Sequence, residues 1–258
     1  MASSVILLHR ITPIGIALVS MAAFASLILS PLLGIKLLFP LWFVLICFFA
    51  RLLLWEFRRP AFWVFLGTPM LLWMSSMIFF FFLEDSLSKW LIAIAVTYAV
   101  ALYAENVFMF YHLPSRYQAY ALENLSLVLY VVSAFFFTSG AFGSQLFLLL
   151  PVWIPMIVVF VAVLLATIAM FWVSKIGFET GRPYAIVGAV ILTELYGVLS
   201  MLPTSFVTNA AIFAVFMYIF LMLSRAQVLE KLTKKTVLTA GAFMSILLLL
   251  ICGTARWL

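Results

Sequence analysis

Nine predominantly apolar stretches, each of about 20 residues, follow one another along the chain and match the length that a helix needs to cross a hydrocarbon core of about 30 Å. Backbone polar groups in lipid must be satisfied within the segment, which favours helices. The stretches predict an all-α, polytopic membrane bundle with transmembrane helices over 11–33, 36–57, 61–83, 89–111, 117–139, 145–174, 183–202, 206–224 and 235–254. The longest connection is 225–234, so we expect one helical domain over 1–258 and no soluble domain.

The composition excludes other classes of protein. Apolar residues make up 68% of the 258 residues and charged residues 9%, whereas soluble domains contain about 45–50% and about 25% respectively. A water-soluble globule, a disordered chain and a disulfide scaffold are therefore excluded. Cys47 and Cys252 lie at opposite ends of the chain, and we expect two separate thiols.

The basic residues predict the orientation, because cytoplasmic loops of membrane proteins are rich in Lys and Arg. With nine spans, eleven of the fourteen Lys and Arg residues fall on the side of the N-terminus. We therefore expect the N-terminus in the cytoplasm and the C-terminus outside, in a plasma membrane of the prokaryotic type. The first stretch is longer than the apolar core of a signal peptide, and we expect it to be retained as a helix.

The chain lacks the residues of common membrane-enzyme chemistries. The two histidines, His9 and His112, lie near predicted cytoplasmic ends, so no haem ligands are available at membrane depth. No Cys-x-x-Cys motif is present, and Asp85 is the sole aspartate. We predict no catalytic residue, no metal, no cofactor and no nucleic-acid partner, and an enzyme is not favoured.

Three glutamates, Glu105, Glu123 and Glu194, fall within predicted spans, where acidic groups are costly and point to function. Glu105 lies nine residues before Pro114 and Glu123 nine after it, so the predicted hairpin places each carboxylate about 10 Å inside its helix end. An asparagine, Asn106 or Asn124, follows each of them. Glu194 is eleven residues into its span, which predicts a position near the midplane.

Polar residues also recur at helical spacing along 117–139. The set comprises Tyr120, Glu123, Ser126, Tyr130 and Ser133. If this face meets the helix that carries Glu105, the two carboxylates share a polar layer.

Arg51 is predicted to lie about 9 Å inside its span, level with Glu105 and Glu123. In one interpretation these three residues form an ion cluster that only fixes the helix register. In the other, two carboxylates face one arginine, and one carboxylate holds a proton or a cation. Glu194 is either protonated and hydrogen-bonded to a neighbour or part of the same path.

Basic residues at the predicted cytoplasmic rim, Arg58, Arg59, Lys234 and Lys235, also allow two interpretations. They bind anionic lipid headgroups, or they enforce topology alone.

The leading hypothesis is a small secondary transporter or permease-like protein that uses intramembrane carboxylates for a proton or cation. The first alternative is a non-catalytic membrane subunit, with partner subunits or further copies of the chain. The second is a lipid-handling, scramblase-like protein.

Overall fold

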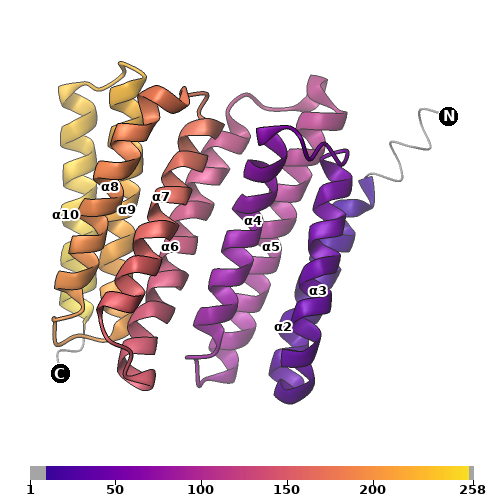
Figure 1. Cartoon of the computed structure of the whole chain (residues 1–258), viewed down its shortest axis with the longest axis horizontal. Coiled ribbons are helices and arrows are strands. Elements are labelled where there is room, and N and C mark those ends of the chain that lie inside the picture. Colours follow the sequence, from indigo (N-terminus) through magenta and orange to yellow (C-terminus); the bar gives the residue numbers. More distant parts are fainter. Residues whose placement is uncertain (1–9, 256–258) are drawn as a thin grey trace. The chain divides into compact units, whose positions relative to one another are not determined.

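The computed structural model describes residues 10–255, and over this range the chain folds into nine α-helices and one short 3-10 helix (Figure 1). All nine α-helices are long and apolar enough to span a membrane, which confirms the predicted number. They are α2 (Thr12–Leu29), α3 (Pro31–Leu52), α4 (Pro60–Phe80), α5 (Ser86–His112), α6 (Ala121–Leu148), α7 (Trp153–Val173), α8 (Phe178–Leu199), α9 (Phe206–Val228) and α10 (Lys234–Thr254), with the 3-10 helix η1 (Pro114–Arg116) between α5 and α6.

The chain divides into two compact units, of which the first ends at Leu125 and the second begins at Ser126. In the first unit α2 packs against both α3 and α5, and α4 packs against α5. In the second unit α7 packs along α8, and α9 lies against both α8 and α10. Each unit has its own buried apolar residues, such as Phe24 and Phe108 in the first and Met170 and Phe213 in the second.

Prolines and polar caps determine where several helices begin. Pro31 and Pro60 occupy the first helical positions of α3 and α4, where a missing N–H costs nothing. The side chains of Asp85, Ser205 and Thr233 accept backbone N–H groups at the starts of α5, α9 and α10. These prolines and caps mark the residues at which the five helices concerned begin, to within a few residues.

Three predicted boundaries were wrong in ways that matter for the site. The second span begins five residues earlier than expected, at Pro31, and ends at Leu52 rather than at Phe57. The fifth span, α6, extends to Leu148, because Pro151 precedes the next helix instead of lying within it. The expected ten-residue loop after the eighth span is shorter, since α9 continues to Val228.

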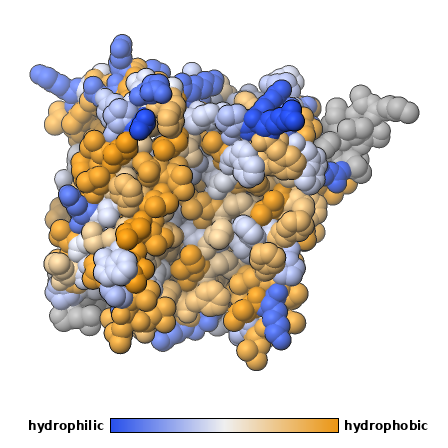
Figure 2. Space-filling model, viewed as in Figure 1, coloured by the Kyte–Doolittle hydropathy of each residue, from blue (hydrophilic) through white to orange (hydrophobic). Residues whose placement is uncertain are grey.

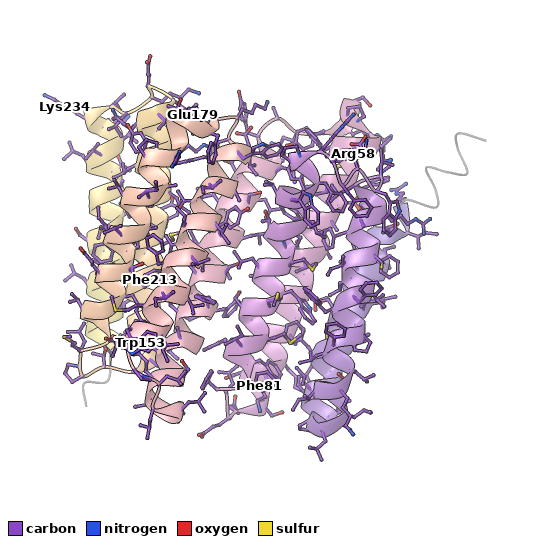
Figure 3. All side chains as sticks on the ribbon, in the orientation of Figure 1. Arg58, Phe81, Trp153, Glu179, Phe213 and Lys234 are labelled. Carbon is purple, nitrogen blue, oxygen red and sulfur yellow. The ribbon has the colours of Figure 1, made fainter. Side chains whose placement is uncertain are left out.

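On the face shown in Figure 2, hydrophilic residues gather at the helix ends, whereas hydrophobic residues cover much of the sides. In the second unit Glu179 and Lys234 lie at one end of the helices and Trp153 lies towards the other (Figure 3). In the first unit Arg58 and Phe81 mark opposite ends (Figure 3). The fold is therefore that of a multi-pass membrane protein. Cys47 and Cys252 are free thiols, as predicted.

Candidate functional site

The start of α6 is built around Tyr117. Its hydroxyl accepts the backbone N–H of Leu122 at 3.1 Å, which satisfies one of the open donors of the first turn. Tyr120 has a φ of 64° and ends the incoming turn, and its carbonyl accepts the N–H of Asn124 at 3.0 Å. Tyr120 is 59% exposed and precedes α6, so it does not belong to the buried polar face that the sequence predicts.

Glu123 lies in the first turn of α6, where the helix dipole favours a negative charge. The expected depth of about 10 Å was wrong, because α6 begins at Ala121 rather than at Tyr117. Glu123 is two residues from that start, so it lies only about 3 Å inside the helix. Glu123 is nevertheless buried, with 8% of its surface exposed. It is thus a buried carboxylate close to a helix end.

Below Glu123, the predicted polar residues of α6 are buried. Ser126, Tyr130 and Ser133 are 0%, 2% and 1% exposed. We call Glu123, Ser126, Tyr130 and Ser133 the α6 polar stripe. Within residues 10–255, the hydroxyls of Ser126 and Ser133 have no hydrogen-bond partner.

The other buried hydroxyls of the chain fall into two groups. Some donate to a carbonyl one turn earlier, as Thr138 does to Ala134 at 2.7 Å and Thr167 to Val163 at 2.8 Å. Others, such as Ser139 and Ser174, have no hydrogen-bond partner within residues 10–255, as Ser126 and Ser133 have none. The two serines of the α6 polar stripe therefore have hydroxyls that are free to bind a further group.

Glu105 lies on α5, seven residues before its end at His112, and is half-buried. At 1.5 Å per residue it is about 10 Å from that end, as the sequence predicts. The carboxylate makes no hydrogen bond or ion pair that the structure records among residues 10–255. The amide of Asn106 donates to Leu102 on the same helix at 2.8 Å, whereas Asn124 is exposed. The two carboxylates are symmetric about Pro114 in sequence but not in depth.

Arg51 is the penultimate residue of α3, not a residue 9 Å inside it. A ring nitrogen of His112 lies 3.2 Å from the carbonyl oxygen of Leu52, which places the ends of α3 and α5 side by side. Glu105 is therefore about 10 Å away from the level of Arg51. In the described part of the chain no ion pair joins Arg51 to Glu105; the recorded ion pair is the exposed contact between Arg59 and Glu56, at 2.9 Å.

Glu194 lies five residues before the end of α8, so its distance from that end is about 7 Å. It is exposed and not buried in the second unit. Its neighbours on the same outer face, Val187, Ile191 and Val198, are 55%, 55% and 61% exposed. The structure thus places one carboxylate in an apolar outer face, nearer to a helix end than to the midplane.

The predicted basic residues are at helix ends and exposed. Arg58 and Arg59 precede α4, and Lys234 and Lys235 begin α10 (Figure 3). Arg59 is engaged with Glu56, a surface pair of small energetic value.

Sequence reasoning missed three side chains of the second unit that each have a buried polar atom, which are Thr193 and Tyr196 of α8 and Gln145 of α6. The Tyr196 ring is fully buried and stacks on Phe142 of α6 with 4.3 Å between ring centroids. In the described chain, the Tyr196 hydroxyl, the Thr193 hydroxyl and the Gln145 amide nitrogen are buried without a partner. The sequence predicts Gln145 at the start of the next span, 145–174, and so gives no sign that Gln145 belongs to α6.

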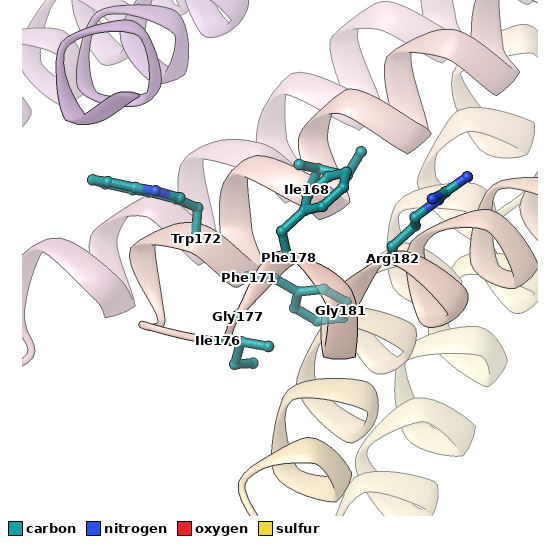
Figure 4. A pocket seen from close by; sticks show the side chains of 8 residues that line it. All are labelled: Ile168, Phe171, Trp172, Ile176, Gly177, Phe178, Gly181 and Arg182. Atoms are coloured by element: carbon teal, nitrogen blue, oxygen red, sulfur yellow. The ribbon is translucent and has the colours of Figure 1, made fainter. Parts of the chain in front are cut away.

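A small cavity lies at the turn between α7 and α8, bounded by Phe171, Trp172, Phe178 and Arg182 among others (Figure 4). Its volume of about 30 Å³ admits at most one or two waters. It is too small to hold a substrate. Within residues 10–255 no three His, Cys, Asp or Glu side chains group as metal ligands would.

The polar groups that remain can accept and pass a proton or coordinate a small cation, since carboxylates and hydroxyls are oxygen ligands.

No family model matches the chain, and comparison with curated proteins and with solved structures finds no match. The functional argument therefore depends on these side chains themselves.

Proposed function

We propose that the chain is a small secondary transporter or permease-like protein that moves a proton or another cation along the α6 polar stripe. One observation supports this most: the stripe begins at a buried carboxylate and continues through two buried hydroxyls, of Ser126 and Ser133, that have no partner in the described chain. Leaving a buried hydroxyl unpaired costs about 1–3 kcal/mol. The carboxylate and the two hydroxyls are groups to which a proton or a cation can bind.

Glu105 is the second carboxylate of the proposed path. It is half-buried about 10 Å inside α5 and has no recorded ion-pair partner among the described residues. In this proposal Glu105 has the same chemical role as Glu123, which is to accept and release a proton or a cation.

The test is flux into proteoliposomes that hold a pH-sensitive dye, driven by an imposed pH gradient or potential. We expect Glu105→Gln and Glu123→Gln to abolish pH-coupled flux, because an amide cannot carry the proton. Glu84→Gln is the matched control, since Glu84 is an exposed loop residue between α4 and α5. Wild-type flux in both Glu105→Gln and Glu123→Gln would exclude the proposal.

Serine variants separate transport from a structural role. Ser126→Ala and Ser133→Ala each remove a hydroxyl without a recorded partner, so stability should stay equal or rise. Flux should nevertheless fall if these hydroxyls carry the proton or cation. A loss of stability with unchanged flux would instead indicate a structural stripe.

The proposed orientation places the N-terminus in the cytoplasm of a prokaryotic-type plasma membrane, following the basic residues. It is tested with a cysteine-free chain that carries single cysteines at Lys231, between α9 and α10, or at Pro203, between α8 and α9. A membrane-impermeant thiol reagent added to intact cells should label the cysteine at position 203 and not the cysteine at position 231. The reverse pattern would invert the topology.

A non-catalytic membrane subunit is the second candidate, favoured by Glu194. A carboxylate in an exposed apolar face is costly in lipid unless a partner supplies a donor. Glu194→Gln should then reduce co-purification of a partner in mild detergent. Glu179→Gln, on the same helix but in its first turn, is the control. Purification of the nine-helix chain without any partner would contradict this candidate.

A further inference from the structure

Helix α10 is the least buried helix of the second unit. Among residues 234–254 it buries only Ala240, and the helix it packs against is α9. Large apolar side chains cover its outer surface, with Leu238 and Leu249 each 74% exposed. α9 and α10 therefore meet along one narrow seam and leave open space beside it.

That space is a groove of about 440 Å³ between the two helices, which we call the α9–α10 groove. Its walls include Tyr218 and Met222 from α9 and Lys235, Thr239, Ala240 and Phe243 from α10. A volume of this size is within the range of small-molecule sites, about 300–1,000 Å³.

The groove changes from charged to apolar along its length. Lys235, Thr239 and Phe243 are spaced four residues apart and so lie on one face of α10. From Lys235 to Phe243 the rise is about 12 Å. The rings of Phe243 and Tyr218 lie 6.2 Å apart and form the deep end. The groove thus has a cation at the helix end and an apolar interior.

Further positive charge surrounds its mouth. Lys231 and Lys234 flank Lys235 in sequence and all three are exposed, against one nearby acidic residue, Glu230. The hydroxyl of Thr236 is engaged with Thr233 of the helix cap at 2.8 Å, whereas Thr239 is exposed on the groove. The mouth therefore offers a cation and a hydroxyl to an anionic group.

We propose that the α9–α10 groove binds one anionic phospholipid. The phosphate lies at Lys235 and the Thr239 hydroxyl, and an acyl chain lies against Ala240, Met222 and Phe243. The positive charge at the mouth favours an anionic group. The apolar interior is open along the side of the helices, so it favours an acyl chain from the hydrocarbon layer. A soluble anion would leave that interior unfilled. This site is independent of the proposed transport path.

The test is native mass spectrometry of the purified chain titrated with phosphatidylglycerol or with phosphatidylcholine of the same chains. We expect one phosphatidylglycerol to bind in preference. Lys235→Gln should weaken its binding about fivefold, the effect of one basic residue near an anionic lipid. Thr239→Phe, which fills the groove from an exposed position, should abolish binding of that lipid.

Two matched controls keep the result specific. Lys175→Gln removes an equal charge in the exposed turn between α7 and α8, outside the groove lining, and Leu238→Phe enlarges a side chain on the outer face of α10. Both should bind as the wild type does. Equal weakening by Lys235→Gln and Lys175→Gln would show diffuse surface attraction and overturn the proposal. So would equal binding of the two lipids, or a dimer of the chain that Thr239→Phe dissociates.

Discussion

Gly34 is the position where one added methyl group should have the largest effect on folding. It lies in the first turns of α3, just after the turn at Ser30 that connects α2 to α3. A Cβ at this position would lie 2.7 Å from Leu27 Cα and 2.8 Å from Leu27 N, both backbone atoms of α2. Side-chain rotation cannot relieve a contact with backbone, so the two helices themselves would have to separate.

The cost of Gly34→Ala follows from that geometry. Ordinary van der Waals contact begins at 3.4 Å, so the backbones must move apart by several tenths of an ångström. Overpacking of this kind costs about 1–3 kcal/mol, and the better helix propensity of alanine returns up to about 1 kcal/mol. We expect a net loss of about 1–2 kcal/mol in the free energy of unfolding.

Gly67 provides the control. It lies in the interior of α4, and a Cβ there would meet nothing within 4 Å. Gly67→Ala should therefore be neutral or stabilising by up to about 1 kcal/mol. The two variants should differ by about 1–3 kcal/mol, which corresponds to about 2–12 °C in Tm, since each kcal/mol corresponds to about 2–4 °C at this chain length. The measurement is thermal unfolding in detergent, and equal Tm values for Gly34→Ala and Gly67→Ala would refute the reasoning.

Three further perturbations test the packing and the helix ends. Gly188→Ala should destabilise α8 against α9, because the new methyl group would overlap the ring of Phe220, and Phe220→Leu should restore the Tm of that variant. Asp85 accepts the backbone N–H of Ser88, which lowers the pKa of its carboxyl below the usual value, so its capping should stabilise the fold above about pH 4 and be lost as the pH falls through the lowered pKa. Asp85→Asn should therefore remove that part of the acid sensitivity, measured as Tm at pH 7 and pH 3, and an unchanged acid profile would contradict it. Tyr117→Phe removes the hydroxyl that accepts an N–H at the start of α6, and unfolding should become easier by about 0.5–1.5 kcal/mol; an unchanged Tm would show that the first turn needs no such cap.

The position of the candidate site could be predicted in part. Periodicity along the fifth span identified Ser126, Tyr130 and Ser133 as one face, and all three are buried. Depth could not be predicted as well, because it depends on where each helix begins. Tyr120 in the left-handed region delays α6, and this moves Glu123 from the expected interior to the first turn.

Arg51 illustrates the same limit on the second span. The apolar run continues beyond Leu52 through Leu53, Leu54 and Trp55, so the sequence gives no sign that the helix ends at Leu52. The structure ends α3 at Leu52 because Leu54 and Trp55 adopt positive φ, at 56° and 57°. The predicted depth of Arg51, and with it the predicted ion cluster, required a helix that continues to Phe57. The turn at Leu54 and Trp55 ends the helix earlier, and the sequence does not reveal that turn.

The sequence by itself determined the number of helices, their approximate spans and the accumulation of charge at their ends. These properties depend on local composition, since burying about 20 apolar residues in lipid outweighs any single polar residue. Only the tertiary structure decided which polar groups are enclosed. Glu194 is exposed while Ser126 is buried, although both lie in helices long and apolar enough to span a membrane. The physical reason is that burial depends on which face of a helix meets its neighbours, and in a chain that is apolar on all sides hydropathy does not distinguish one face from another.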